Sequence, residues 1–253
     1  MTTQPFGRAD LHIHTSASDG SMSVRELLDH VAKMSTLDVI AITDHDRLDA
    51  SVWAFERRDR YPFDIVPGVE VSTAEGHMLA LWVTEPAPTG LSMAETAAAI
   101  HEQNGIAILA HPFFTQMAGT RRAARTYRRD PVYLLRAGLD GLETFNGSVI
   151  LPGSNTVAAC VARWLGLGMT GGSDAHSLGA VGTGITQFDG RTASDLRRAL
   201  LHRRTTAVGR PWPLREHAKF VVDFIARRGR MLWDEFDGDD GPEHETAAIE
   251  PRA

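Results

Sequence analysis

The sequence predicts an α/β fold in which short buried strands alternate with helices. Two observations carry this prediction. Continuous apolar runs such as 39–43 and 106–110 are typical of strands that are buried on both faces. Helix-start patterns, with a Ser or Thr three positions before an acid, stand at Ser23 and Thr192. The 253 residues suit one large domain or two small ones, and periodicity leaves an open doubly wound sheet and a barrel as alternatives.

The elements follow one another without an internal repeat or a low-complexity linker between them. Strands are expected, in chain order, at 11–14, 39–43, 63–72, 77–83, 106–110, 141–145 and 168–172. Helices are expected at 23–34, 48–58, 92–104, 153–166, from 192 onward and at 214–233, with an arginine-rich helix after the strand at 106–110.

The net charge of -6 comes from the end of the chain. The last twenty residues hold eight acidic side chains and one basic side chain, so the remaining 24 acids nearly balance 25 bases. The body therefore lacks the basic excess of a general nucleic-acid-binding protein. The stretch 236–253 is acidic and poor in large apolar residues, which predicts a disordered tail.

A single cysteine, Cys160, excludes an internal disulfide and a cysteine-rich zinc site. It lies in the apolar run 157–161, so we expect it to be buried in a helix. No apolar run approaches the roughly 18 residues of a membrane span. The first eight residues lack the apolar region of a signal peptide. We therefore expect a cytoplasmic protein without a membrane partner.

Histidine and carboxylate side chains recur where the predicted strands begin or end. His12 and His14 are two residues apart, so their side chains point the same way, and Asp174 and His176 repeat this spacing. Ligands of α/β folds bind at the carboxyl ends of the strands. Five strand ends or starts are therefore expected to bring polar side chains to one face: His12, His14, Asp44, His45, Asp46, Glu70, His77, His111, Asp174 and His176.

Imidazole nitrogen and carboxylate oxygen suit zinc, manganese or iron, whereas the lack of thiolate argues against copper(I) and iron–sulfur clusters. Taken singly, each residue has a structural alternative. A strand-end histidine is often simply hydrogen-bonded, Asp19 before Gly20 is typical of a turn, and Asp44 could cap a helix. Their recurrence at five strand ends favours a metal site. The remaining histidines fall in predicted helices or the tail and are left out: His30, His101, His202, His217 and His244.

In this order the residues resemble the motifs of the PHP (polymerase and histidinol phosphatase) domain family. The resemblance runs from about residue 8 to 208 and rests on His12-Ile-His14 with Ser18-Asp-Gly20, Thr43-Asp-His-Asp46, Pro67-Gly-Val-Glu70, Ala110-His-Pro112 and Gly172-Ser-Asp-Ala-His176. It implies a distorted (β/α)7 barrel over residues 8–210, with a C-terminal helix at 211–235 packed on it before the tail.

The resemblance also implies two or three divalent metal ions, Mn, Zn or Fe, at the carboxyl face. A first metal would be held by His12, His14, Glu70 and Asp174. Glu70 would bridge to a second metal, which His77 and His111 also hold. Asp19, His45 and His176 would hold a third. Asp19 stands where some relatives have histidine, an exchange that favours harder ions such as manganese.

The function implied by the resemblance is that of a stand-alone metal-dependent phosphoesterase. It would cleave a small phosphorylated metabolite or nucleotide with metal-activated water. No serine nucleophile is required, and Ser173 is not in a G-x-S-x-G elbow. The segment from Glu70 to His77 also resembles metallohydrolases grouped with carbaryl esterase. A carboxylic ester or carbamate hydrolase is therefore the alternative, and a non-catalytic PHP module is a third possibility.

Three further residues are candidates for catalysis. Asp46 either orients a ligand such as His45 or caps the next helix. Arg121, in the arginine-rich stretch 120–129, either clamps a phosphate or lies on a solvated helix face. Asn146 either contacts substrate or forms an Asn-Gly turn. The expected partner is a small phosphorylated substrate. No stable nucleic-acid partner is expected, and the oligomeric state is left open.

Overall fold

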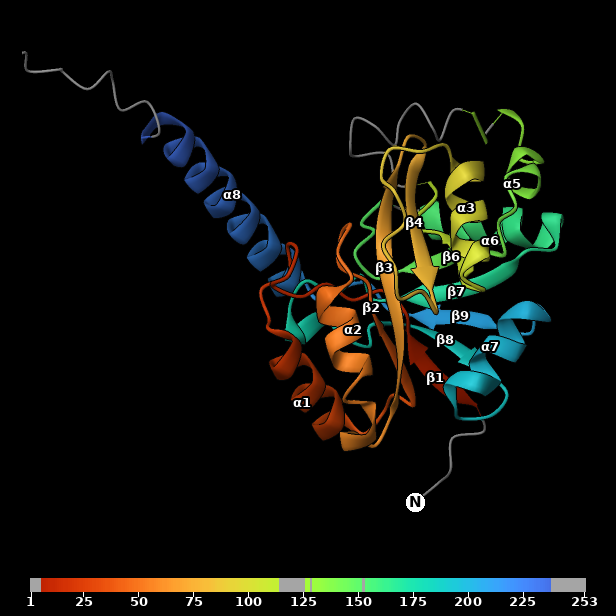
Figure 1. Cartoon of the computed structure of the whole chain (residues 1–253), viewed down its shortest axis with the longest axis horizontal. Coiled ribbons are helices and arrows are strands. Elements are labelled where there is room, and N and C mark those ends of the chain that lie inside the picture. Colours follow the sequence, from red (N-terminus) through yellow and green to blue (C-terminus); the bar gives the residue numbers. More distant parts are fainter. Residues whose placement is uncertain (1–5, 114–125, 128, 152, 238–253) are drawn as a thin grey trace, which may run out of the picture.

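Nine strands of the described chain form one mixed sheet in the order β7-β6-β5-β4-β3-β2-β1-β8-β9 (Figure 1). This computed structural model describes residues 6–113, 126, 127, 129–151 and 153–237. The strands are β1 (Gly7–Asp10), β2 (Val39–Ile42), β3 (Asp64–Thr73), β4 (Gly76–Leu81), β5 (Ile106–Leu109), β6 (Gly141–Asn146), β7 (Gly168–Gly172), β8 (Gly184–Phe188) and β9 (Thr206–Gly209).

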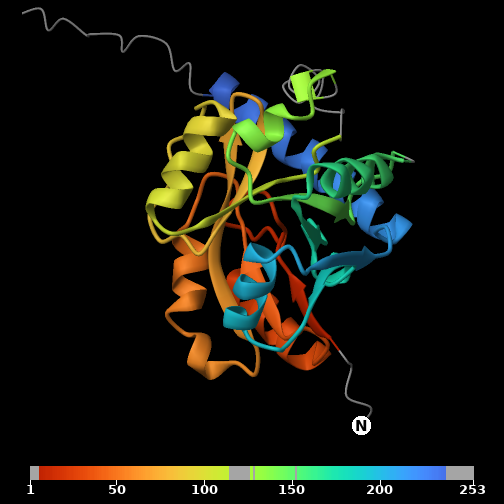
Figure 2. The ribbon, with the colours of Figure 1, turned by 90° about the vertical axis from the view of Figure 1, so that its right-hand side faces the viewer.

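Helices lie outside this sheet, as the view turned by 90° in Figure 2 shows. They are α1 (Val24–Met34), α2 (Asp49–Phe55), α3 (Met93–Glu102), α5 (Tyr133–Arg136), α6 (Ser154–Leu165), α7 (Ala193–Leu201) and α8 (Leu214–Asp237), with short 3-10 turns at Arg58–Arg60 and Leu178–Ala180. The capping boxes predicted at Ser23 and Thr192 are both present, at the starts of α1 and α7. None of the described helices is both long and apolar enough to cross a membrane.

The sheet curls into a nearly closed barrel. Beyond the ends of β1 and β7, Ile13 and Ala175 form a parallel bridge, in which the amide of His14 donates to the carbonyl of Ala175 at 2.9 Å. On the other side of β7, the Thr186 hydroxyl of β8 accepts from the amide of Gly171 at 2.9 Å. Strands β1 to β7 therefore run once around the barrel, which confirms the distorted (β/α)7 barrel that the sequence implied.

The barrel is not wholly parallel, because β4 runs antiparallel between β3 and β5. The two residues between β3 and β4 leave room only for a hairpin turn, so the chain must reverse direction there. This hairpin brings His77, at the start of β4, beside Ser72 near the end of β3. The histidine thereby reaches the same end of the barrel as the carboxyl ends of the parallel strands.

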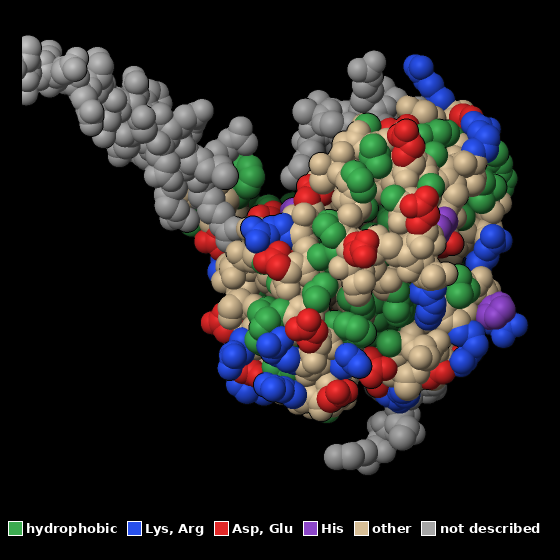
Figure 3. All heavy atoms as spheres, viewed as in Figure 1, with side chains coloured by type: hydrophobic (Ala, Val, Ile, Leu, Met, Phe, Trp, Pro, Cys, Tyr) green, Lys and Arg blue, Asp and Glu red, His purple; other side chains and the backbone are tan. Residues whose placement is uncertain are grey.

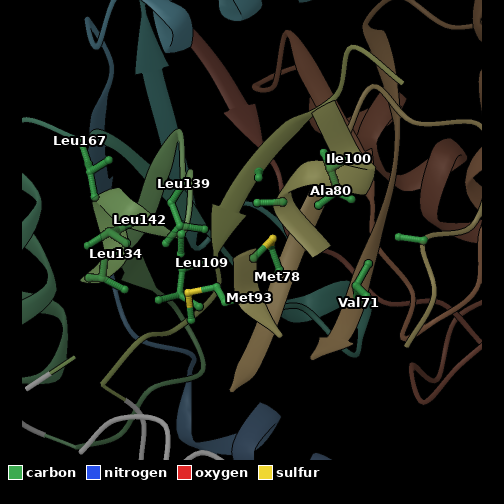
Figure 4. Packing of buried hydrophobic residues seen from close by; sticks show 14 of the residues in the cluster. Val71, Met78, Ala80, Met93, Ile100, Leu109, Leu134, Leu139, Leu142 and Leu167 are labelled. Carbon is green, nitrogen blue, oxygen red and sulfur yellow. The ribbon is translucent and has the colours of Figure 1, made fainter. Parts of the chain in front are cut away.

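The helices are held to the barrel by apolar side chains from both. Figure 4 shows one such cluster, in which Val71, Met78 and Leu109 of the strands pack with Met93 and Ile100 of α3. Met78, Met93 and Ile100 are fully buried. On the face shown in Figure 3, acidic and basic side chains are both present, and neither sign covers the surface.

Several sequence predictions of local structure were wrong. The first strand is Gly7–Asp10 rather than 11–14, because the chain leaves the β1–β2 ladder before the histidine pair and only Ile13 forms a further bridge. Strands β8 and β9 were not predicted. Cys160, expected to be buried, is exposed on α6.

The C-terminal helix α8 begins at Leu214 and runs to Asp237, and most of it projects away from the barrel (Figure 1). Its first two turns lie at the barrel mouth, where Glu216 is buried and accepts a hydrogen bond from the Ser177 hydroxyl at 2.6 Å. The tail was predicted at 236–253, but residues 236 and 237 belong to α8, and residues 238–253 lie outside the described residues, as do Arg121 and most of the arginine-rich stretch.

Candidate metal centre

The structure brings all nine predicted ligands together at the mouth of the barrel. They come from the loops after β1, β2, β5 and β7 and from the β3–β4 hairpin. They form four overlapping groups, in each of which the possible ligand atoms lie within 4.8 Å of one another. These groups are His14, Asp19, His45 and His176; His12, His14 and Asp174; His12, Glu70 and His111; and His45, Glu70 and His77.

The fully buried carboxylate of Glu70 lies at the centre of these groups. Its two oxygens face different sets of imidazoles. Oε1 lies 3.0 Å from Nδ1 of His77 and 2.9 Å from Nε2 of His111. Oε2 lies 3.1 Å from Nε2 of His12, 3.2 Å from Nε2 of His14 and 3.2 Å from Nδ1 of His45. A carboxylate that divides its oxygens in this way has the geometry to bridge two cations.

Hydrogen bonds satisfy only some of these imidazoles. Both ring nitrogens of His14 and Nδ1 of His77 are buried and make no well-aligned hydrogen bond among the described residues, although Nε2 of His14 and Nδ1 of His77 lie close to Glu70. Each such buried group costs about 1–3 kcal/mol if nothing binds it. Divalent ions accept imidazole and carboxylate lone pairs together, so the donor set fits metal ions, and the absence of thiolate fits Zn, Mn or Fe.

Electrostatics at the site favour bound positive charge. Burial lowers the pKa of His14, but contacts with Asp174 and Glu70 outweigh burial and raise this pKa to about 10. Burial likewise opposes ionisation of Glu70, but the surrounding histidines, His12 first, hold its pKa well below the usual range. The pKa of Asp174 is lowered in the same way. The carboxylates are therefore ionised and need cations beside them, either protons on the imidazoles or metal ions.

A second buried carboxylate, Glu143, holds two of the predicted ligands, His12 and His111, in place. Its Oε1 lies 2.9 Å from Nδ1 of His12, and its Oε2 accepts from the amide of His111 at 2.9 Å. With the proton of His12 on Nδ1, Nε2 is free to face Glu70 and a metal ion. Sequence reasoning missed Glu143, although it lies inside the predicted strand 141–145, where a charged residue in a buried run is itself a signal.

The loop that carries Asp19 is fastened by Asp44. The Asp44 carboxylate accepts from the amide and the hydroxyl of Thr15, both at 2.7 Å, and from the hydroxyl of Ser18 at 2.5 Å. Asp19 is thereby held with Oδ2 3.1 Å from Nε2 of His176. Burial opposes the ionisation of Asp19, but His176 outweighs it and lowers the pKa of Asp19 below its usual range.

The three predicted catalytic candidates have different positions. Asp46 does not line the cavity: its Oδ1 accepts from the amide of Ser72 at 2.7 Å, so it joins the loop after β2 to β3. Asn146 lies behind the ligands and donates through Nδ2 to Glu143 at 2.8 Å and to Asp174 at 3.1 Å. Arg121 lies outside the described residues. The structure thus places Asp46 and Asn146 as supports around the centre.

A cavity of about 180 Å³ opens over the centre. Predicted ligands line it together with residues that sequence reasoning did not select: Ser148, Ile150, Trp212, His217, Phe220 and Val221. The sequence places His217 in a predicted helix, which gives no sign of a role at the site. Its position on the first turns of α8, above the barrel mouth, could not be read from the local sequence pattern.

Comparisons with known proteins agree with this architecture. The PHP domain family model matches residues 10–142, and the PHP-associated model matches residues 152–205. An uncharacterized protein of Methanocaldococcus jannaschii is 34% identical over 152 residues, which cover 55% of this chain and 81% of that protein. The 5'-3' exoribonuclease Rnm of Escherichia coli is 41% identical over 71 residues, which cover 27% of this chain and 24% of the enzyme.

A solved structure has a similar fold. It is a two-domain protein from Bacteroides vulgatus that contains a predicted PHP-like metal-dependent phosphoesterase. It matches with a TM-score of 0.62 at 19% sequence identity, over 82% of this chain and 66% of that one. This match shows that the two folds are similar. The two family models match the sequence itself, over most of the barrel. The chain belongs to the PHP domain family.

Proposed function

We propose that the protein is a metal-dependent phosphoesterase that hydrolyses a small phosphorylated substrate. The family assignment and the His, Asp and Glu donor set support metal-dependent hydrolysis. The observation that carries the proposal is the Glu70 carboxylate, whose two oxygens face separate sets of imidazoles. Adjacent divalent ions bridged by a carboxylate are typical of phosphatases and nucleases.

The grouping of the donors supports two or three ion positions. His12, His14 and Asp174 would hold one ion with Glu70. His77 and His111, which both lie close to Oε1 of Glu70, would hold a second ion together with Glu70. Asp19, His45 and His176, with His14 close by, form a group suited to a third.

Bound ions would supply the positive charge that activates a water molecule and stabilises the phosphoryl oxygens. The residues around them hold this arrangement rigid. Glu143 fixes the ring of His12, and Asn146 and the Ser148 hydroxyl both donate to Oδ2 of Asp174, the latter at 2.7 Å. Among the described residues that line the cavity none is Lys or Arg, so the charge of a phosphoryl group would be balanced there by the ions.

The names of relatives support the same class of reaction. The Escherichia coli relative is a 5'-3' exoribonuclease, and the Bacteroides vulgatus structure is described as containing a phosphoesterase. Both reactions cleave phosphoesters.

The test combines metal analysis with a set of chromogenic substrates. We expect the purified protein, supplied with manganese or zinc, to hydrolyse p-nitrophenyl phosphate or bis-p-nitrophenyl phosphate and to leave p-nitrophenyl acetate intact. His14→Ala should abolish turnover and lower the bound metal, whereas the exposed His101→Ala, paired with Asp140 outside the centre, should change neither. Esterase activity without phosphatase activity would instead support the carboxylic ester or carbamate hydrolase.

A further inference from the structure

The segment from Trp212 to the second turn of α8 lies outside both family-matched ranges, yet it is built into the barrel mouth. The indole Nε1 of Trp212 donates to the carbonyl of Ser173 at 2.6 Å, and its amide donates to the carbonyl of Gly147 at 2.9 Å. Glu216 adds the hydrogen bond from Ser177. The start of α8 is therefore fastened to the loops that follow β6 and β7, beside the metal ligands.

Together with Ile150, this segment gives the cavity an apolar part of its lining beside the ligands. Ile150, Trp212, Phe220 and Val221 line it, and the Phe220 ring meets the His176 ring edge to face, with 4.7 Å between the ring centres. Val221 is 52% exposed and Ile150 61% exposed. Apolar side chains left in water beside a polar, charged centre are typical of a surface that a ligand covers.

We propose that these residues form a specificity wall, defined as Ile150, Trp212, Phe220 and Val221, that binds a flat apolar group of the substrate. The inference rests on the proposed function and names its substrate class: a phosphoester that carries an aromatic ring, rather than a polyol phosphate. The phosphoryl group lies at the metal centre and the ring packs against Phe220 and Val221. An aromatic partner gains both apolar burial and ring-to-ring contact there.

The test measures binding rather than turnover. Phenylphosphonate and methylphosphonate share the anionic head and differ only in the ring, and both resist hydrolysis. Calorimetry on the manganese-loaded full-length protein should show phenylphosphonate binding about tenfold more tightly than methylphosphonate. Phe220→Ala should reduce this ratio to about twofold and leave the affinity for methylphosphonate unchanged. Val222→Ala is the matched control, since Val222 is an exposed α8 residue that does not line the cavity.

Because Phe220 touches His176, the metal content of each variant is measured as well. Phe220→Leu keeps an apolar side chain against His176 and removes the ring, so it should lower the ratio while retaining metal even if Phe220→Ala does not. An equal affinity for both phosphonates, or an affinity ratio unchanged in Phe220→Leu, would refute the specificity wall. Neither result would contradict the proposed hydrolysis of p-nitrophenyl phosphate. If neither phosphonate bound the metal-loaded protein, this result would contradict both the proposed phosphoesterase function and the specificity wall.

Discussion

At the scale of single residues, Glu70 shows why the centre needs cations. Five imidazole nitrogens lie 2.9–3.2 Å from its two oxygens, whereas an ionised carboxylate has about four acceptor sites. Glu70 and His14 are both fully buried, so water does not supply partners for the ring nitrogens of His14 that remain unsatisfied. Glu143, which lies behind His12, contacts Nδ1 of that ring, so Nε2 faces Glu70.

The first prediction concerns Glu143, which holds the ring of His12 and the amide of His111. Glu143→Gln keeps the shape but removes the charge that favours the proton on Nδ1 of His12. Metal affinity should fall by about 10- to 100-fold, as it does when outer-layer partners of a ligand are lost. A competition titration against a chromogenic chelator measures this. The exposed Glu102→Gln serves as control, and an affinity within twofold of the original would contradict the role.

The second prediction follows from the raised pKa values of the histidines. Burial lowers the pKa of His12 and His14, but neighbouring carboxylates outweigh it, raising the former well above its usual value and the latter to about 10. In the metal-free protein both imidazole rings are therefore in the doubly protonated, cationic form at pH 7. A metal ion that binds to such a ring must displace one of its protons. Metal affinity should rise as pH increases from 7 towards 10.

Calorimetry in two buffers with different ionisation enthalpies would count the protons released. The same raised pKa values also determine how the stability of the metal-free fold changes with pH. A raised histidine pKa stabilises the folded state fully below pH 6.5, and this stabilisation disappears as pH rises through about 10. Metal binding without proton release at pH 7 would contradict this account.

At the scale of elements, the loop between β1 and α1 carries Asp19 to the centre. Asp44, which follows β2, holds this loop through three hydrogen bonds from Thr15 and Ser18. Asp44→Ala should release Asp19 and thereby weaken the group formed with His45 and His176. The other three groups of possible ligands do not contain Asp19.

The measurable result is a selective loss of metal. Mass spectrometry of the metal-loaded Asp44→Ala protein should show about one ion fewer per chain than the original. Its free energy of unfolding should fall by about 1–3 kcal/mol, because buried groups lose their partners. Asp49→Ala, on the solvent-exposed start of α2, is the control. Loss of all ions in Asp44→Ala would show that the loop supports the whole centre.

The elements also show which parts of the molecule the sequence could predict. Capping boxes are local, so the starts of α1 and α7 were predicted correctly. The ligands recur at strand ends, a pattern visible along the chain, and the structure brings all nine together. Glu143 could not be assigned in this way, because its contact with His12 spans 131 positions. The position of His217 and Phe220 over the cavity likewise depends on how α8 is fastened to distant loops.

At the scale of the whole molecule, the centre connects strands that are far apart in the chain, so its occupancy should govern global stability. Ions that bind the folded state at about 100 times their Kd stabilise it by about 3 kcal/mol. For a chain of this size that corresponds to a rise in Tm of roughly 6–12 °C. Differential scanning calorimetry should show this rise when manganese is added to chelator-treated protein. His14→Ala should not respond, whereas His101→Ala should respond fully, and an equal rise in all three proteins would mean that manganese acts elsewhere.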